Sequence, residues 1–153
     1  MSVVDSSIAP RYIEAVYCPD TDGNCGFHCI AKEIYNDQKN KDDPAKDEWK
    51  LIKQEMLDHV NDNFDWYTSL LGATHLANAV KVLECRREKV GPELYFCSPE
   101  HPRIVAETFK RTVVFLSNQE RYTVVPYLSE PVKKMPIFMQ LSMAHLYHVK
   151  IKE

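Results

Sequence analysis

The pattern of apolar residues changes near Lys110, and this change constrains the fold more than any other feature. Before Lys110, apolar side chains recur mostly at the spacing of amphipathic helices. After it come four short β-branched and aromatic runs, TVVFLS, RYTVVPYL, PIFMQL and HLYHVKIK, separated by NQE and SEPVKKM. Such runs are typical of strands. The sequence therefore predicts an α+β fold, with the helices of the first two-thirds packed on a small, mainly antiparallel or mixed sheet formed mostly by the C-terminal third.

Capping and stop signals divide the helical part into segments. Apolar residues from Phe27 to Ile34 recur at helical spacing, so we expect a helix over residues 25–35. Aspartate followed by proline is a strong helix start. Four further helices are predicted. One runs from Asp42-Asp43-Pro44 to about Asn61, a short one ends at Gly72, one begins at a capping Thr74, and one begins at Ser98-Pro99.

No internal repeat or break in composition divides the 153 residues, of which 44% are hydrophobic. We therefore expect a single domain over 1–153 with its own core, in which 1–15 is a peripheral N-terminal segment. The formal net charge is -3 and the lysines are interleaved with acids, which disfavours a nucleic-acid partner. We expect a monomer.

The remaining bulk features concern location. No apolar run approaches the ~20 residues of a membrane span. The first 16 residues lack the basic and then apolar pattern of a signal peptide. The five cysteines are an odd number, for which reduced thiols are the simplest interpretation. We expect an intracellular protein, cytoplasmic or nuclear, without a membrane partner.

Cys25 follows Asp22-Gly23-Asn24 and begins a predicted helix. At that place it could be a buried apolar residue, a metal ligand or a nucleophile. Unpaired N–H groups and the positive end of the helix dipole favour a thiolate there. The same N–H groups could hold a developing oxyanion. The position suits acyl-transfer chemistry, which then needs a base.

Two histidines begin the last predicted strand, His145 and His148, far from Cys25 in the sequence. A cysteine near one end of the chain and a histidine near the other is the order of papain-like enzymes. Of the other histidines, His59 and His75 lie in predicted scaffold helices and His101 in the first turn of a helix. His28 lies three residues after Cys25 in the same predicted helix, with its side chain towards another face.

Three segments resemble one family. The stretch DGNCGFH, residues 22–28, resembles the nucleophile motif D-G-N-C-x-F/Y-R/H of the OTU (ovarian-tumour) cysteine proteases. Gly26 in place of the commoner leucine resembles OTU-like domains of fungal and plant transposon-associated type. LYFCSPEHPRIVAETFKRTVVFLS is similar to the middle of that group, and AHLYHVKIK to the closing strand N-H-F/Y-x-x-V-x-L. The resemblance runs from about Val16 to Ile151.

The resemblance implies a papain-like cysteine peptidase of OTU type that needs no cofactor and no metal. It would hydrolyse the isopeptide bond after the C-terminal glycine of ubiquitin or a ubiquitin-like protein, with ubiquitin or polyubiquitin as its partner. Cys25 would be the nucleophile, His145 the base and Asp22 the third catalytic group. The backbone N–H groups of Gly23, Asn24 and Cys25 would form the oxyanion hole.

The closing pattern selects His145 over His148. In the family, the catalytic histidine stands four residues before a β-branched residue and six before an aliphatic one, as His145 does with Val149 and Ile151. These three residues also share one face of a strand, whereas His148 falls on the opposite face. We therefore expect His148 to be a surface or neighbouring residue.

The closing strand departs from the family pattern where the imidazole is oriented. Tyr147 stands where the family often has Asp or Asn, Leu146 replaces an aromatic and Ala144 replaces asparagine. Asp22 could therefore orient His145 or support the oxyanion turn, and Asp20 or another carboxylate could act instead.

Two other functions stay open. The first is a catalytically weak or inactive OTU-fold module that binds ubiquitin. The second is a metal-binding regulatory domain, although the spacings of its possible ligands are irregular for structural zinc: Cys25, Cys29, Cys85 and Cys97.

Overall fold

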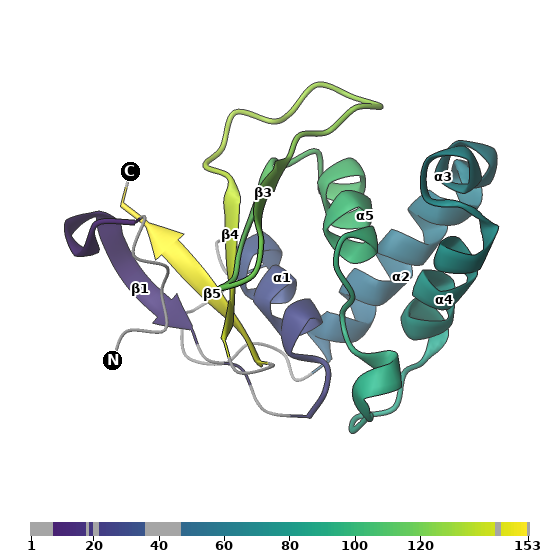
Figure 1. The fold of residues 1–153 in the computed structure, drawn as a ribbon, viewed down its shortest axis with the longest axis horizontal. Helices are drawn as coiled ribbons and strands as arrows, with labels where there is room; N and C mark the ends of the chain where they lie inside the picture. The colour runs from purple at the N-terminus through teal and green to yellow at the C-terminus, as the bar shows by residue number, and fades with distance from the viewer. Residues whose placement is uncertain (1–7, 18, 20–21, 36–46, 143–144, 153) are drawn as a thin grey trace.

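The computed structural model describes residues 8–17, 19, 22–35, 47–142 and 145–152. The helix start predicted at Asp42-Asp43-Pro44 lies outside these residues, as do Asp20 and Ala144. Figure 1 shows a sheet on one side and helices on the other, which is the predicted α+β arrangement.

The sheet has five strands in the order β1-β5-β4-β2-β3. It is mixed, because β2 and β4 are parallel while the other neighbouring pairs are antiparallel. Four strands coincide with the predicted runs: β2 (Val113–Leu116), β3 (Arg121–Val124), β4 (Ile137–Ser142) and β5 (His145–Ile151). The C-terminal third therefore forms most of the sheet, as predicted.

The fifth strand, β1 (Ile13–Tyr17), overlaps the segment expected to be peripheral and pairs with β5 at the edge of the sheet. Its central residues Glu14, Ala15 and Val16 are exposed, so β1 lacks the apolar alternation that marks a half-buried strand. Its pairing with β5 makes it part of the sheet.

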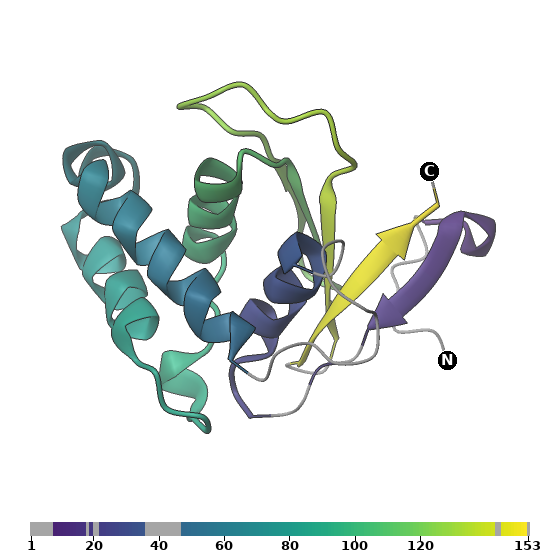
Figure 2. The same ribbon diagram turned by 180° about the vertical axis from the view of Figure 1, so that it is seen from behind.

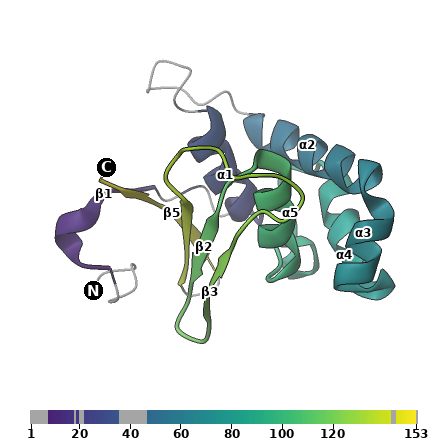
Figure 3. The ribbon, with the colours of Figure 1, turned by 90° about the horizontal axis from the view of Figure 1, so that it is seen from above.

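The α-helices form two layers, which Figures 2 and 3 show from behind and from above. α1 packs on β4 and β5, and α5 packs on β2 and β3. α2 lies against both of these helices and α4, and α3 packs on α2 and α4. Their bounds are α1 (Cys25–Tyr35), α2 (Glu48–Asp62), α3 (Phe64–Leu71), α4 (Ala73–Glu84) and α5 (Glu100–Phe109).

Gly72 separates α3 from α4. The predicted end of the third helix at Gly72 is confirmed, because Gly72 has a φ of 86° at the C-cap. The same residue is the N-cap of α4, so the prediction that Thr74 caps this helix was wrong. A glycine that turns the chain sharply can be the C-cap of one helix and the N-cap of the next. Thr74 therefore lies inside the first turn of α4.

The core lies between the sheet and α1, α2 and α5. Its largest fully buried apolar side chains come from every one of these elements. They include Phe27, Ile52, Ile104, Phe115 and Met139. None of the described helices is long and apolar enough to cross a membrane.

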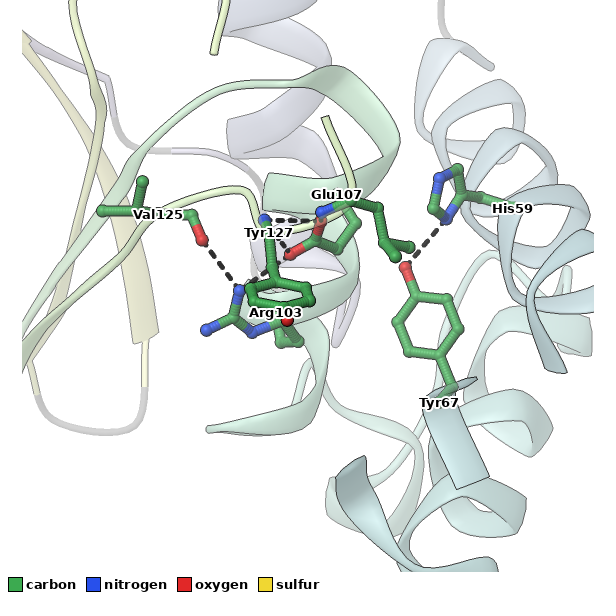
Figure 4. Close-up of polar contacts among 7 residues, drawn as sticks. His59, Tyr67, Arg103, Glu107, Val125 and Tyr127 are labelled. Atoms are coloured by element: carbon green, nitrogen blue, oxygen red, sulfur yellow. Dashed lines mark hydrogen bonds and ion pairs between the residues drawn. The ribbon is translucent and has the colours of Figure 1, made fainter. Parts of the chain in front are cut away.

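A buried carboxylate on α5 holds the segment after β3, as Figure 4 shows. Glu107 accepts hydrogen bonds from the backbone N–H groups of Tyr127 and Leu128 at 2.8–3.0 Å. Arg103 donates to Glu107 at 2.7 Å and to the carbonyl of Val125 at 2.8 Å. The charge of Glu107 is thereby compensated, and the segment after β3 is fixed to α5.

Candidate active site

The turn before Cys25 requires a glycine. Gly23 has a φ of 88°, which L side chains rarely adopt. A Cβ on Gly23 would overlap the carbonyl oxygen of Val90 and meet the ring of Tyr95. The N–H of Val90 donates to the carbonyl of Asp22 at 3.0 Å. The turn is thus clamped against the segment that follows α4.

Asn24 fixes the other side of the turn. Its fully buried side chain donates to the carbonyls of Arg87 and Glu88 at 3.2 and 3.3 Å. Its backbone carbonyl accepts the N–H of His28 at 3.0 Å, which begins α1. Cys25 therefore stands at the N-terminus of this helix, as predicted.

Asp22 bonds inside the turn and to the helix. Its Oδ1 accepts the backbone N–H of Asn24 at 2.8 Å, and its Oδ2 lies 2.9 Å from Nε2 of His28. The imidazole that Asp22 contacts is therefore that of His28, one turn into α1, whose side chain was expected to point towards another face. The backbone N–H of Asn24 is occupied by Asp22, so this hydrogen bond would have to break before the N–H could hold an oxyanion.

A buried lysine supports the segment that holds the turn. Lys53 on α2 is fully buried, and its Nζ donates to the carbonyl of Cys85 at 2.8 Å. The same Nζ lies 4.7 Å from the ring centre of Phe27 and 5.1 Å from that of Trp49. Burial lowers the pKa of Lys53 to about 8.

The structure brings Cys25 beside the start of β5. The pairing of β1 with β5 ends at Tyr17 and His148, two residues short of Leu146. There α1 contacts the backbone of Leu146, whose carbonyl accepts the thiol of Cys29 at 3.5 Å. His145 is the residue next to Leu146, so the predicted nucleophile and base come from adjoining parts of the fold.

The helix N-terminus was expected to favour the thiolate of Cys25, but the structure raises the pKa of this thiol. Cys25 is only 7% exposed, and burial raises its pKa above the ordinary value of 9.0. Backbone N–H groups of Leu146 and Gly26 oppose this rise, and the charge of Asp22 adds to it. Desolvation thus outweighs the helix terminus, and the thiol needs a proton acceptor before it can attack.

His145 and His148 lie on opposite faces of β5, as the alternation predicts. His145 is half-buried, and its ring centre lies 4.7 Å from that of Tyr147. His148 is 4% exposed and its Nε2 lies 2.8 Å from Oε2 of Glu33, while Arg111 donates to the other oxygen, Oε1, at 2.5 Å. The expectation of a surface position for His148 was wrong, because α1 packs on that face of the strand.

The glycine after Cys25 has a packing reason. A Cβ on Gly26 would overlap the ring of Phe96, which lies in the segment before α5. The Phe96 ring also packs edge-on against Phe27, with 5.2 Å between ring centres. The start of α1 can approach this segment closely only without a side chain at position 26.

The possible zinc ligands are not gathered into a site in the part of the chain that the structure describes. Among the described residues, no three His, Cys, Asp or Glu side chains are grouped to hold a metal ion. Cys25, Cys29, Cys85 and Cys97 are free cysteines. Cys97 is held by His101, whose Nδ1 accepts the Cys97 N–H at 2.7 Å.

Neither the protein-family models nor the curated proteins match this sequence. Solved structures do match. The viral OTU domain protease from Dera Ghazi Khan virus is 13% identical, with a TM-score of 0.63 over 94% of this chain and 83% of that protein. The protease from Farallon virus is 14% identical, with a TM-score of 0.58 over 94% of this chain and 86% of that protein. The Hazara virus OTU, solved bound to ubiquitin, is 19% identical, with a TM-score of 0.53 over 94% of this chain and 84% of that protein. The chain therefore has the fold of these OTU domains.

Proposed function

We propose that this protein is an OTU-type cysteine peptidase that hydrolyses the isopeptide bond after the C-terminal glycine of ubiquitin or a ubiquitin-like protein. The observation that carries the proposal is the packing of α1, which begins at Cys25, on β5, which begins at His145, with the Cys29 thiol 3.5 Å from the carbonyl of Leu146. The likeness to viral OTU proteases supports the chemistry, and the ubiquitin in the Hazara virus structure supports the partner.

In the proposed mechanism His145 takes the proton of Cys25, whose buried thiol needs a proton acceptor. The sulfur then attacks the carbonyl of the scissile bond, and backbone N–H groups of Gly23 and Cys25 hold the oxyanion. His145 returns the proton to the leaving amine, and water hydrolyses the thioester. No step requires a metal or a cofactor.

Asp22 acts in this proposal through the turn. Its contacts with Asn24 and His28 support the oxyanion-turn role over a direct contact with His145. The kinship with fungal and plant transposon-associated domains rests on Gly26 and on the segment LYFCSPEHPRIVAETFKRTVVFLS, and it stays a prediction, since the viral structures do not bear on it.

A ubiquitin probe with an electrophilic C-terminus tests the proposal. The wild-type protein should form a covalent adduct at Cys25, seen as a mass increase that survives denaturation. Cys25→Ala should abolish the adduct without unfolding the protein. Cys29→Ala is the matched control, because Cys29 lies one turn further along α1 and also contacts Leu146. An adduct that persists in folded Cys25→Ala would refute the assignment.

The second candidate is a catalytically weak or inactive ubiquitin-binding module. The burial that raises the pKa of Cys25 favours it, because a protonated thiol is a poor nucleophile. Such a module would bind ubiquitin in a dissociable complex and leave isopeptide-linked chains intact. Cleavage of a panel of ubiquitin chains by the purified protein would exclude it.

A further inference from the structure

Tyr147 occupies a defined place beside His145. The two residues are separated by one position on β5, so their side chains share a face of the sheet. Their ring centres are 4.7 Å apart and the ring planes meet at 76°. The edge of one ring therefore points at the face of the other, which is a favoured arrangement of aromatic pairs.

The backbone at Tyr147 is held by the neighbouring strand and through the residue that follows. Tyr147 pairs with Gln140 on β4. The next residue, His148, bonds through its side chain to Glu33 on α1. His145, in contrast, stands at the first position of β5. A ring on a fixed part of the strand can restrict the rotamers of an imidazole at its beginning.

The contact also suits the charge that the proposed reaction creates. When the proton of Cys25 moves to the imidazole, sulfur becomes an anion and the imidazole a cation. An aromatic face attracts a cation by its quadrupole, and it neither gives nor takes the proton. A Tyr147 ring that turns its face to the imidazole favours the imidazolium as well as orienting it.

We propose that Tyr147 is a positioning residue for the reaction, and that its ring holds the His145 imidazole in the orientation that accepts the proton of Cys25. The inference rests on the proposed cysteine-peptidase chemistry. It assigns the effect to the ring and not to the hydroxyl, so Tyr147→Phe should behave differently from a change to an aliphatic residue.

The test measures two rates. The first is alkylation of Cys25 by iodoacetamide at neutral pH, followed by mass spectrometry of the Cys25 peptide, which needs no ubiquitin. The second is cleavage of a ubiquitin substrate, with kcat and KM determined separately. The variants are Tyr147→Phe, Tyr147→Leu and, in case the leucine variant does not fold, Tyr147→Met. Phe138→Leu is the matched control, a half-buried aromatic on the same face of the sheet, paired with Val149.

Tyr147→Leu and Tyr147→Met should lower the alkylation rate and kcat by about five- to tenfold, as expected for loss of one aromatic contact, with KM unchanged. Tyr147→Phe should keep most of both rates, and Phe138→Leu should match the wild type. Wild-type rates in the aliphatic variants would overturn the inference, as would a phenylalanine variant as slow as leucine. If ubiquitin is not cleaved but the alkylation pattern holds, the proposed substrate fails and the positioning role stands.

Discussion

At the scale of single residues, Asp22 both closes the DGNC turn and ties it to α1. One carboxylate oxygen closes the turn through the N–H of Asn24, and the other reaches His28 on α1. Both contacts are ones that a side-chain amide can also make, because its oxygen accepts and its NH₂ donates to an unprotonated imidazole nitrogen. The structure thus predicts which substitutions the turn tolerates.

Asp22→Asn should therefore form the ubiquitin-probe adduct at close to the wild-type rate. Asp22→Ala should slow it and lower the free energy of unfolding by about 1–2 kcal/mol, because both contacts are lost. Adduct kinetics and urea unfolding measure the two effects. An asparagine variant as inactive as Cys25→Ala would show that the charge of Asp22 is needed.

The two histidines of β5 should have opposite roles. His145→Ala should lower the acylation rate by several orders of magnitude without unfolding the protein. In this variant, alkylation of Cys25 should keep rising with pH beyond 9.0, because burial raises the pKa of the thiol. His148→Ala should leave alkylation unchanged and destabilise the fold by about 1–3 kcal/mol, since Glu33 loses a buried partner. Reversed results would mean that the face of β5 is misassigned.

At the scale of elements, Glu33 joins α1 to the sheet. Its oxygens contact His148 on β5 and Arg111, just before β2. Burial by itself would raise the pKa of Glu33, but these two partners outweigh it, and the pKa lies below the ordinary 4.5. The helix that carries Cys25 is thus fixed to the strand that carries His145 by a charged contact.

The stability contributed by Glu33 should depend on pH with a defined sign. The carboxylate is favoured in the folded state, so its contribution is complete above 4.5 and is lost as pH falls through the lower folded pKa. Glu33→Gln should lower the free energy of unfolding by about 1–3 kcal/mol near neutral pH. The difference from wild type should shrink as the pH falls below 4.5.

Urea titrations across this pH range provide the measurement. Glu14→Gln is the control, because Glu14 is half-exposed and lies 3.7 Å from Lys150. Surface pairs of this kind contribute about 0–1 kcal/mol. A constant difference between Glu33→Gln and wild type at all pH values would contradict the assignment.

At the scale of the whole molecule, buried polar contacts tie together segments far apart in the sequence. Asn24 holds the segment after α4, Glu33 joins α1 to β5, and Glu107 holds the segment after β3. Each contact compensates a group whose burial would otherwise be costly. The relative positions of these segments therefore depend on such anchors.

Glu107→Ala should destabilise the protein by about 3–5 kcal/mol, because Arg103 and two backbone N–H groups lose their acceptor. Urea unfolding gives the magnitude. The exposed Glu130 serves as the control, and Glu130→Ala should change stability by less than about 0.5 kcal/mol. If both variants behave alike, the Glu107 contacts do not stabilise the fold.

The sequence by itself determined the types of most elements and the turn that precedes α1. Helical and strand spacing are local properties, so residues 25–35 and the four C-terminal runs could be predicted from their own side chains. Strand alternation likewise placed His145 and His148 on opposite faces. The edge strand β1 carries no such local signal, and its pairing with β5 was found only in the structure.

Only the tertiary structure decided which groups are buried and with what they pair. It placed His28 against Asp22 and His148 against Glu33, and it buried Cys25 so that desolvation outweighs the helix terminus. The physical reason is that spacing along a chain reports which face of an element is apolar. Desolvation and charge partners depend instead on which distant segments pack against that face.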